Sequence, residues 1–236
     1  MPETRIIAAD IDFTLTDENF RLDTTAVQKI RELEERAIKV ILVSGRNLPA
    51  TGSLAQLIGT CGLVVAENGG VIARNQTPIK VLGRIENARA ALRMLRKRMG
   101  RKVIERPDSK LGMRLASVSL ERSFEFEEAE RLIRRSRLKV DLIDTGVTYI
   151  LLDQRVNKGD ALVRLARLAK LSLTRSVGIG DNYNDLDLFR KVAYKIAVAN
   201  APDGVKQQAD YVCMHSYSRG FLEAVAHIGL RRACTS

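Results

Sequence analysis

The 236-residue chain has few of the side chains that build disulfide frameworks and zinc sites. It has no tryptophan, only two histidines and only three cysteines. Cys61, Cys213 and Cys234 are odd in number and far apart in the sequence, which argues against a disulfide framework or a cysteine metal cluster. His215 and His227 are too few for a zinc site with ordinary ligand spacing. Any chemistry must therefore depend on carboxylates, lysine, hydroxyl groups and the backbone.

Long apolar runs are also absent from the sequence. No run approaches the ~20 residues that are needed to cross a bilayer, and no charged-then-apolar leader precedes Arg5. Hydrophobic residues make up 45% of the chain and charged residues 28%, which is typical of a globular protein with a sizeable core. We therefore expect a soluble, cytoplasmic protein with no membrane partner. The sequence leaves the oligomeric state open, with a homodimer as one candidate.

Positive charge is concentrated in the middle of the chain, whose net charge is +11. Residues 83–155 contain 18 Lys and Arg against 11 Asp and Glu. These basic stretches lack interleaved aromatics and accompany no recognised nucleic-acid motif, so we expect no nucleic-acid partner and interpret them as solvated helix faces. A second interpretation is a basic lid that draws anionic substrates toward a site.

Two patterns divide the chain into a core and an insertion. Short β-branched runs alternate with helical periodicity, which predicts parallel strands between helices. The expected strands are 6–9, 40–43, 63–66, 177–179 and 196–198, and the expected helices are 24–37, 48–58, 158–169, 183–191 and 218–229. Between them the order is helix 86–99, strands 103–106 and 113–120, helix 126–137, and strands 140–143 and 148–152. We predict an α/β protein with a Rossmann-like core, residues 1–82 and 156–236, and an inserted α+β (αββαββ) domain, residues 83–155.

Acidic residues follow the first predicted strand in the stretch RIIAADIDFTLTD. Residues i and i+2 of a strand point the same way, so Asp10 and Asp12 are expected to converge on one spot at the sheet edge. The second strand ends in VSGRN, where Ser44 offers a hydroxyl group and Gly45 lets a backbone N–H approach an anion. Ligands of open α/β sheets bind at this carboxyl edge.

Two later stretches bring further charged groups to the same edge. The strand at 177–179 runs into GDNYND, which contains Asp181 and Asp185, and Lys158 opens a helix in RVNKGD. Each residue taken alone could be a helix cap, a turn residue or a solvated side chain. Together they predict a divalent cation, Mg²⁺, held by carboxylates beside a phosphate.

Two carboxylates at such a site can share the work of phosphate-ester hydrolysis. Asp10 can attack phosphorus and form an acyl phosphate. Asp12 can protonate the leaving oxygen and then activate water.

The chain resembles the haloacid dehalogenase superfamily of phosphohydrolases in four motifs that occur in order: DIDFT, the serine of VSGRN, the lysine of VNKG, and GDNYND. The resemblance implies that Asp10 is phosphorylated and that Mg²⁺ is held by the Asp10 carboxylate, the Asp12 backbone carbonyl and Asp181. It implies that Asp185 is either a further ligand or a group next to the ligands. It also implies that Ser44 and Lys158 bind the phosphate.

The insertion resembles the type IIB cap of the Cof-like branch of this superfamily. The short cap, the AENGG stretch and the SYSRG turn are most similar to archaeal phosphoglycolate phosphatases. Asn68 in AENGG is a candidate contact to substrate or cap, and its simpler interpretation is a turn residue. The expected substrate is a small phosphorylated metabolite, with 2-phosphoglycolate preferred.

Three alternatives stay open. The first is a sugar-phosphate or phosphosugar-acid phosphatase, similar to the sucrose-phosphate and mannosyl-phosphoglycerate phosphatases. The second is a phosphotransferase or mutase, and the third is a nucleic-acid-binding protein on an inactive core. The sequence also departs from the resemblance at one position, since Phe13 stands where the superfamily usually has glycine. We expect the backbone there to tolerate the side chain, and the ring to project toward the cap and narrow the cleft.

Overall fold

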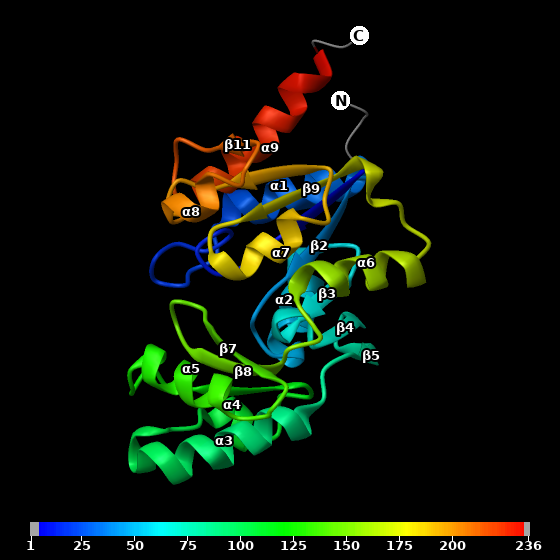
Figure 1. Cartoon of the computed structure of the whole chain (residues 1–236). Helices are drawn as coiled ribbons and strands as arrows, with labels where there is room; N and C mark the ends of the chain where they lie inside the picture. The colour runs from blue at the N-terminus through cyan, green and yellow to red at the C-terminus, as the bar shows by residue number, and fades with distance from the viewer. Residues whose placement is uncertain (1–4, 234–236) are drawn as a thin grey trace.

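The computed structural model describes residues 5–233 and is built around an eight-stranded sheet (Figure 1). Its strand order is β11-β10-β9-β1-β2-β3-β4-β5, in which β11 through β3 pair in parallel and β4 and β5 form an antiparallel edge. The strands are β1 (Ile6–Ala9), β2 (Lys39–Val43), β3 (Leu63–Ala66), β4 (Val71–Arg74), β5 (Thr77–Val81), β9 (Ser176–Gly180), β10 (Tyr194–Ala197) and β11 (Tyr211–Val212). The parallel sheet that the apolar runs predict is confirmed.

Helices cover both faces of this sheet, as parallel strands require. Three of them begin at a polar side chain that accepts a hydrogen bond from the first turn: Asp23, Asn47 and Asn157. The helices of this part are α1 (Thr24–Glu35), α2 (Leu48–Ile58), α6 (Lys158–Leu168), α7 (Leu186–Phe189), α8 (Asp203–Lys206) and α9 (Tyr217–Ala233). Three short 3-10 turns accompany them: η1 (Glu67–Gly69), η3 (Leu173–Arg175) and η4 (Tyr183–Asp185). In the described range, no helix combines the length and the apolar character needed to span a membrane.

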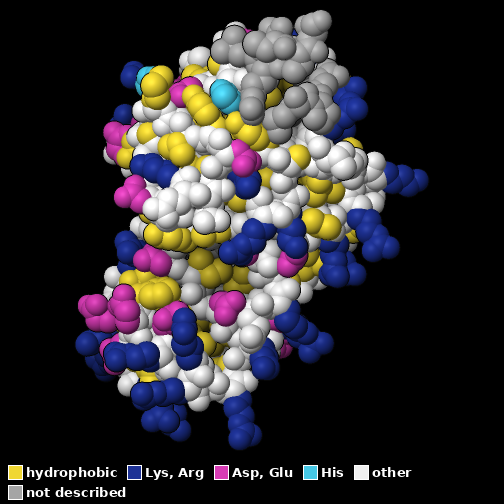
Figure 2. Space-filling view, turned by 45° about the horizontal axis from the view of Figure 1, so that its top comes forward, with side chains coloured by type: hydrophobic (Ala, Val, Ile, Leu, Met, Phe, Trp, Pro, Cys, Tyr) yellow, Lys and Arg dark blue, Asp and Glu magenta, His cyan; other side chains and the backbone are white. Residues whose placement is uncertain are grey.

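Residues 83–155, called the cap below, form a separate layer under the core in Figure 1. Three antiparallel strands in the order β6-β8-β7 carry helices α3 and α5 on one face, where their apolar side chains form a second core. The elements are α3 (Ile85–Met99), η2 (Gly100–Lys102), α4 (Pro107–Lys110), β6 (Ser117–Leu120), α5 (Phe126–Arg135), β7 (Val140–Asp144) and β8 (Tyr149–Asp153). On the face shown in Figure 2, the basic side chains of this layer are interspersed with acidic ones, as solvated helix faces would be.

The strand expected at 103–106 is reduced to one bridge, between Glu105 and Leu120. Arg106 N–H still donates to the Ser119 carbonyl, but Pro107 follows, has no N–H to donate and begins α4. The strand expected at 113–120 is likewise shorter and begins only at Ser117. The αββαββ order is therefore present with its first strand nearly lost.

Asp153 joins the two chain segments that connect the cap to the core. Its carboxylate is buried and accepts hydrogen bonds from the Arg84 N–H and the Asn87 amide on one segment, and from Arg155 on the other. The Arg155 hydrogen bonds outweigh burial and lower the pKa of Asp153 to about 2. The two chain segments between core and cap are therefore held together by hydrogen bonds to one ionised carboxylate.

Candidate active site

Four segments bring charged groups to the carboxyl edge of the core sheet. Asp10 follows β1, Ser44 follows β2, Asp181 follows β9, and Lys158 is the first residue of α6. Lys158 has only 1% of its surface exposed, and its Nζ lies 3.0 Å from Asp10 Oδ1 and 2.7 Å from Asp185 Oδ1. Residues 10, 158, 181 and 185 thus meet as the motifs predict.

The carboxylates of this cluster carry more negative charge than Lys158 can neutralise. Burial, opposed by Lys158 and supported by Asp185 and Asp12, raises the pKa of Asp10 to about 7. Burial and the nearby Asp10 also raise the pKa of Asp181. Burial alone would lower the pKa of Lys158, but Asp10 and Asp185 raise it, so this lysine stays charged. A cation would relieve the remaining repulsion between the acids.

The chemistry of the donor set fits a hard divalent cation. Carboxylate oxygens of Asp10, Asp181 and Asp185 lie within 4.8 Å of one another. Asp185 accepts a hydrogen bond from Lys158 at Oδ1 and accepts further hydrogen bonds from the backbone N–H groups of Asp181 and Asn182 at Oδ2. Asp181 uses Oδ1 for the Thr14 hydroxyl group, at 3.1 Å. Asp10 and Asp181 therefore each have one carboxylate oxygen left that could bind a metal. The carboxylate of Asp185 instead orients Lys158 and the loop that contains Asp181 and Asn182.

Asp10 and Asp12 lie on the wall of the same cavity, as expected, and Asp12 contributes to the raised pKa of Asp10. The alternation of a strand is not the reason, because strand β1 ends at Ala9, before both acids. Asp12 also faces Arg46, which donates from Nε to Asp12 Oδ2 at 2.9 Å and from Nη2 to Oδ1 at 2.5 Å. Asp12 and Arg46 thus form a bidentate ion pair on the core wall of the cavity.

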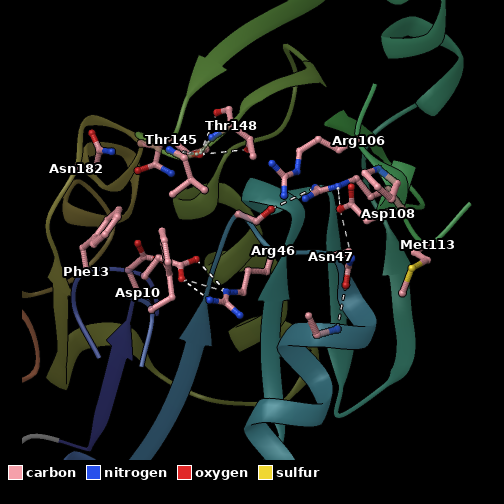
Figure 3. A pocket seen from close by; sticks show the side chains of 18 of the residues that line it. Asp10, Phe13, Arg46, Asn47, Arg106, Asp108, Met113, Thr145, Thr148 and Asn182 are labelled. Carbon is pink, nitrogen blue, oxygen red and sulfur yellow. Dashed lines mark hydrogen bonds and ion pairs between the residues drawn. The ribbon is translucent and has the colours of Figure 1, made fainter. Parts of the chain in front are cut away.

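A cavity of about 590 Å³ separates the core from the cap (Figure 3). Its core wall includes Asp10, Asp12, Gly45, Arg46 and Asp181. Ser44, Asn68, Lys158 and Asp185 are buried next to these residues but are not part of the wall. The cap wall includes Arg106, Asp108, Met113, Arg114, Thr145 and Thr148.

Asn68 lies against the loop that follows β2. A Cβ atom on Gly45 would lie 3.0 Å from Asn68 Nδ2, so a larger residue at this position would require the amide to shift. Asn68 Oδ1 accepts from Asn184 Nδ2 at 2.9 Å, but Asn68 Nδ2 and Asn184 Oδ1 are buried without a partner among the described residues. A buried donor next to Gly45 suits an anionic ligand.

Phe13 adopts φ +60°, so this position does need the left-handed conformation that favours glycine. The expectation of a tolerant backbone is wrong here, but the ring does face the cap, because its Cε2 lies 3.9 Å from the place of a Cβ on Gly146. The ring also packs on Phe20 at 5.0 Å and Tyr217 at 6.4 Å between centroids. This packing compensates for the strained backbone.

Several residues that shape the site have partners that the sequence did not reveal. Arg114 of the cap donates from Nη1 to the Gly45 carbonyl at 3.2 Å and from Nε to Asp108 at 2.7 Å. Asn47, which caps α2, donates to the same Asp108. Glu67 is fully buried and accepts the backbone N–H groups of residues 115, 116 and 117 of the cap. The motifs VSGRN and AENGG contain two of these residues, Asn47 and Glu67, but only the fold reveals their partners.

The haloacid dehalogenase-like hydrolase family matches residues 7–97 and 121–225 of the chain, and this match includes all the motif residues above. The chain belongs to the haloacid dehalogenase-like hydrolases. Two archaeal proteins named phosphoglycolate phosphatase are similar to this family member over nearly their whole length. The one from Methanoculleus marisnigri is 35% identical and aligns over 94% of this chain and 95% of its own. The one from Archaeoglobus fulgidus is 36% identical and aligns over 98% of this chain and 100% of its own.

Solved structures show that this hydrolase shares its arrangement of core and cap with other proteins. A Thermoplasma acidophilum protein superimposes with a TM-score of 0.83 at 27% identity, covering 97% of this chain and 99% of its own. The Synechocystis sucrose-phosphatase, solved with sucrose and phosphate, has a TM-score of 0.72 at 20% identity, with 96% and 98% covered. At that identity the likeness concerns the fold alone.

Proposed function

We propose that this hydrolase is a Mg²⁺-dependent phosphatase of small phosphorylated metabolites and that its preferred substrate is 2-phosphoglycolate. The observation that supports the reaction is the buried cluster in which Lys158 lies 3.0 Å from Asp10, beside two further carboxylates. The names of the two archaeal relatives support the substrate.

In the proposed reaction, a carboxylate oxygen of Asp10 attacks phosphorus while the bond to the leaving oxygen breaks and that oxygen takes a proton from Asp12. Asp12 then takes a proton from water, whose oxygen attacks the phosphoryl group, and Asp10 is regenerated as phosphate leaves. Lys158 favours the ionised form of Asp10, and the Asn68 amide and the Gly45 backbone receive the phosphate oxygens. A Mg²⁺ ion held by Asp10, the Asp12 carbonyl and Asp181 would neutralise phosphate charge.

Phosphate release from a panel of esters tests this proposal. The panel contains 2-phosphoglycolate, sucrose phosphate and mannosyl-phosphoglycerate, each measured after chelation of metals and again with added MgCl₂. We expect kcat/KM to be highest for 2-phosphoglycolate and the rate to return only with a divalent cation. Hydrolysis that is equally fast with and without chelator would contradict the metal requirement.

The cavity volume favours phosphosugar acids as a second candidate. About 590 Å³ is more space than the glycolate group needs. The same panel decides between the two, because a higher kcat/KM for mannosyl-phosphoglycerate would replace 2-phosphoglycolate as the substrate.

Replacing Phe13 tests whether its ring restricts the size of the substrate. Phe13→Gly removes a ring from the cavity wall and suits the left-handed backbone. We expect kcat/KM for sucrose phosphate to rise relative to that for 2-phosphoglycolate by roughly tenfold, the size of effect that pocket shape supplies. Phe20→Leu, which keeps an apolar side chain in the same aromatic group, is the control. An unchanged ratio in Phe13→Gly would show that the ring does not select substrates.

A further inference from the structure

We propose that Arg106 of the cap binds the carboxylate of the substrate and thereby determines specificity. This inference rests on the proposed function, because it assumes a phosphate ester with a second anionic group. It assigns a role to a residue outside the four motifs.

The charged groups of the cap wall leave one net positive charge at the cavity. Asp108 and Arg114 form an ion pair with a distance of 2.7 Å. Arg114 also donates hydrogen bonds from Nη1 to the Gly45 carbonyl and the Ser117 hydroxyl group, and its side chain is buried. Arg114 is thus held by protein acceptors, and Arg106 is the remaining charged residue that the described cap contributes to the wall.

Arg106 combines a fixed backbone with an accessible guanidinium group. Its N–H donates to the Ser119 carbonyl at 2.9 Å, and Pro107 starts α4 directly after it. Its side chain is 36% exposed and pairs with Glu121, itself 40% exposed, at 3.1 Å. A pair between two such exposed groups is weak, so a substrate carboxylate can replace Glu121 as the partner.

The place of Arg106 in the cavity suits a ligand with an anion at each end. Figure 3 shows Arg106 on the cap side and Asp10 and Arg46 on the core side. Arg46 already donates from both Nε and Nη2 to Asp12, whereas the Arg106 side chain donates from Nη1 to Glu121, so Arg106 has more donors left for a substrate carboxylate. With the phosphate at Asp10, the other end of 2-phosphoglycolate faces the cap. An arginine can bind that carboxylate through two parallel hydrogen bonds, which a neutral group of the same size cannot form.

The test compares 2-phosphoglycolate with 2-hydroxyethyl phosphate, which has a neutral hydroxymethyl group in place of the carboxylate. We expect Arg106→Gln to lower kcat/KM for 2-phosphoglycolate by roughly 10- to 100-fold, mainly through KM, and to change that for 2-hydroxyethyl phosphate by less than about threefold. Arg106→Lys should recover part of the loss, because it keeps the charge but not the two-pronged geometry.

Two control variants separate this role from a general effect of charge. Arg134→Gln removes an exposed arginine of α5 that does not line the cavity, so it should leave both substrates unaffected. The single variant Arg106→Gln leaves Glu121 without its arginine partner, and the double variant Arg106→Gln with Glu121→Gln removes that unpaired acid. The double variant should show the same selective loss of kcat/KM for 2-phosphoglycolate. Thermal melting confirms that each variant is folded.

The outcomes distinguish this inference from the proposed function. If the wild type hydrolyses neither ester with Mg²⁺, the proposed function fails, and this inference fails with it. If the wild type prefers 2-phosphoglycolate and Arg106→Gln keeps that preference, only the role of Arg106 is overturned. An equal loss for both esters would also overturn it, since a carboxylate receptor cannot act on a substrate without a carboxylate.

Discussion

Asp10→Asn is expected to abolish turnover of 2-phosphoglycolate, lowering kcat by roughly 10³-fold or more, as loss of a covalent nucleophile does. The amide has nearly the shape of the carboxylate but cannot form the acyl phosphate. It also removes one negative charge from the buried cluster, in which the pKa of Asp10 is raised to about 7 by burial and the neighbouring acids. The folded protein should therefore be no less stable than the wild type. The measurement is phosphate release together with thermal melting.

Trapping the intermediate distinguishes Asp10 from Asp12. The substrate carries a label in its phosphoryl group, and the reaction is stopped with acid. We expect the wild-type protein to retain label and the Asp10→Asn protein to retain none. The Asp12→Asn protein should also retain label, because activation of water is impaired. Asp203→Asn, at an aspartate that is 92% exposed, is the matched control and should behave as the wild type. Label on the Asp10→Asn protein would show that another residue is the nucleophile.

Lys158→Met is expected to have the second-largest effect, on both activity and stability. Methionine has a similar length, but it leaves Asp10 and Asp185 without their common cation. Breaking a buried ion pair in this way costs about 3–5 kcal/mol of unfolding free energy. We expect kcat to fall by roughly 10²-fold or more, because phosphate charge is then less well stabilised.

Added MgCl₂ should raise the melting temperature of Lys158→Met more than that of the wild type, because a bound cation replaces part of the lost positive charge. Lys191→Met, at a lysine that is 40% exposed and pairs with Asp160, is the control and should change the melting temperature little. A melting temperature of Lys158→Met equal to that of the wild type without metal would show that the lysine does not stabilise the carboxylates.

The sequence was sufficient to predict those parts of the structure that are determined by a local pattern of residues. Apolar runs predicted the parallel strands, and the position of Asp181 and Lys158 relative to strand and helix ends predicted that they meet Asp10. Asp12 also lies beside Asp10 on the cavity wall, but the alternation of a strand does not explain its place, since β1 ends three residues earlier. Periodicity describes a side chain only while the regular element lasts.

Contacts between the cap and the core could not be predicted from the sequence. Arg114 and Gly45 are 69 residues apart, and Glu67 accepts hydrogen bonds from backbone groups about 50 residues away. A backbone N–H carries no sequence signal, so no pattern shows that it will need a buried carboxylate. The β4–β5 hairpin was also missed, because the solvent-exposed β5 lacks the apolar run that marks the inner strands.

The Glu67 contacts give the cap one fixed edge and one free edge. At the fixed edge, Glu67 and the Gly45 carbonyl hold residues 114–117 by hydrogen bonds. At the opposite edge, Gly146 of the β7–β8 loop faces the core, where a Cβ atom built on it would lie 3.9 Å from the Phe13 ring and 3.8 Å from Asn182 Nδ2. A rotation about the fixed edge would hardly move the loop that follows β2, but it would widen the gap beside Phe13. The half of the cavity beside Gly45, where we propose that phosphate binds, can thus keep its geometry while the half beside Phe13 admits substrate and releases product.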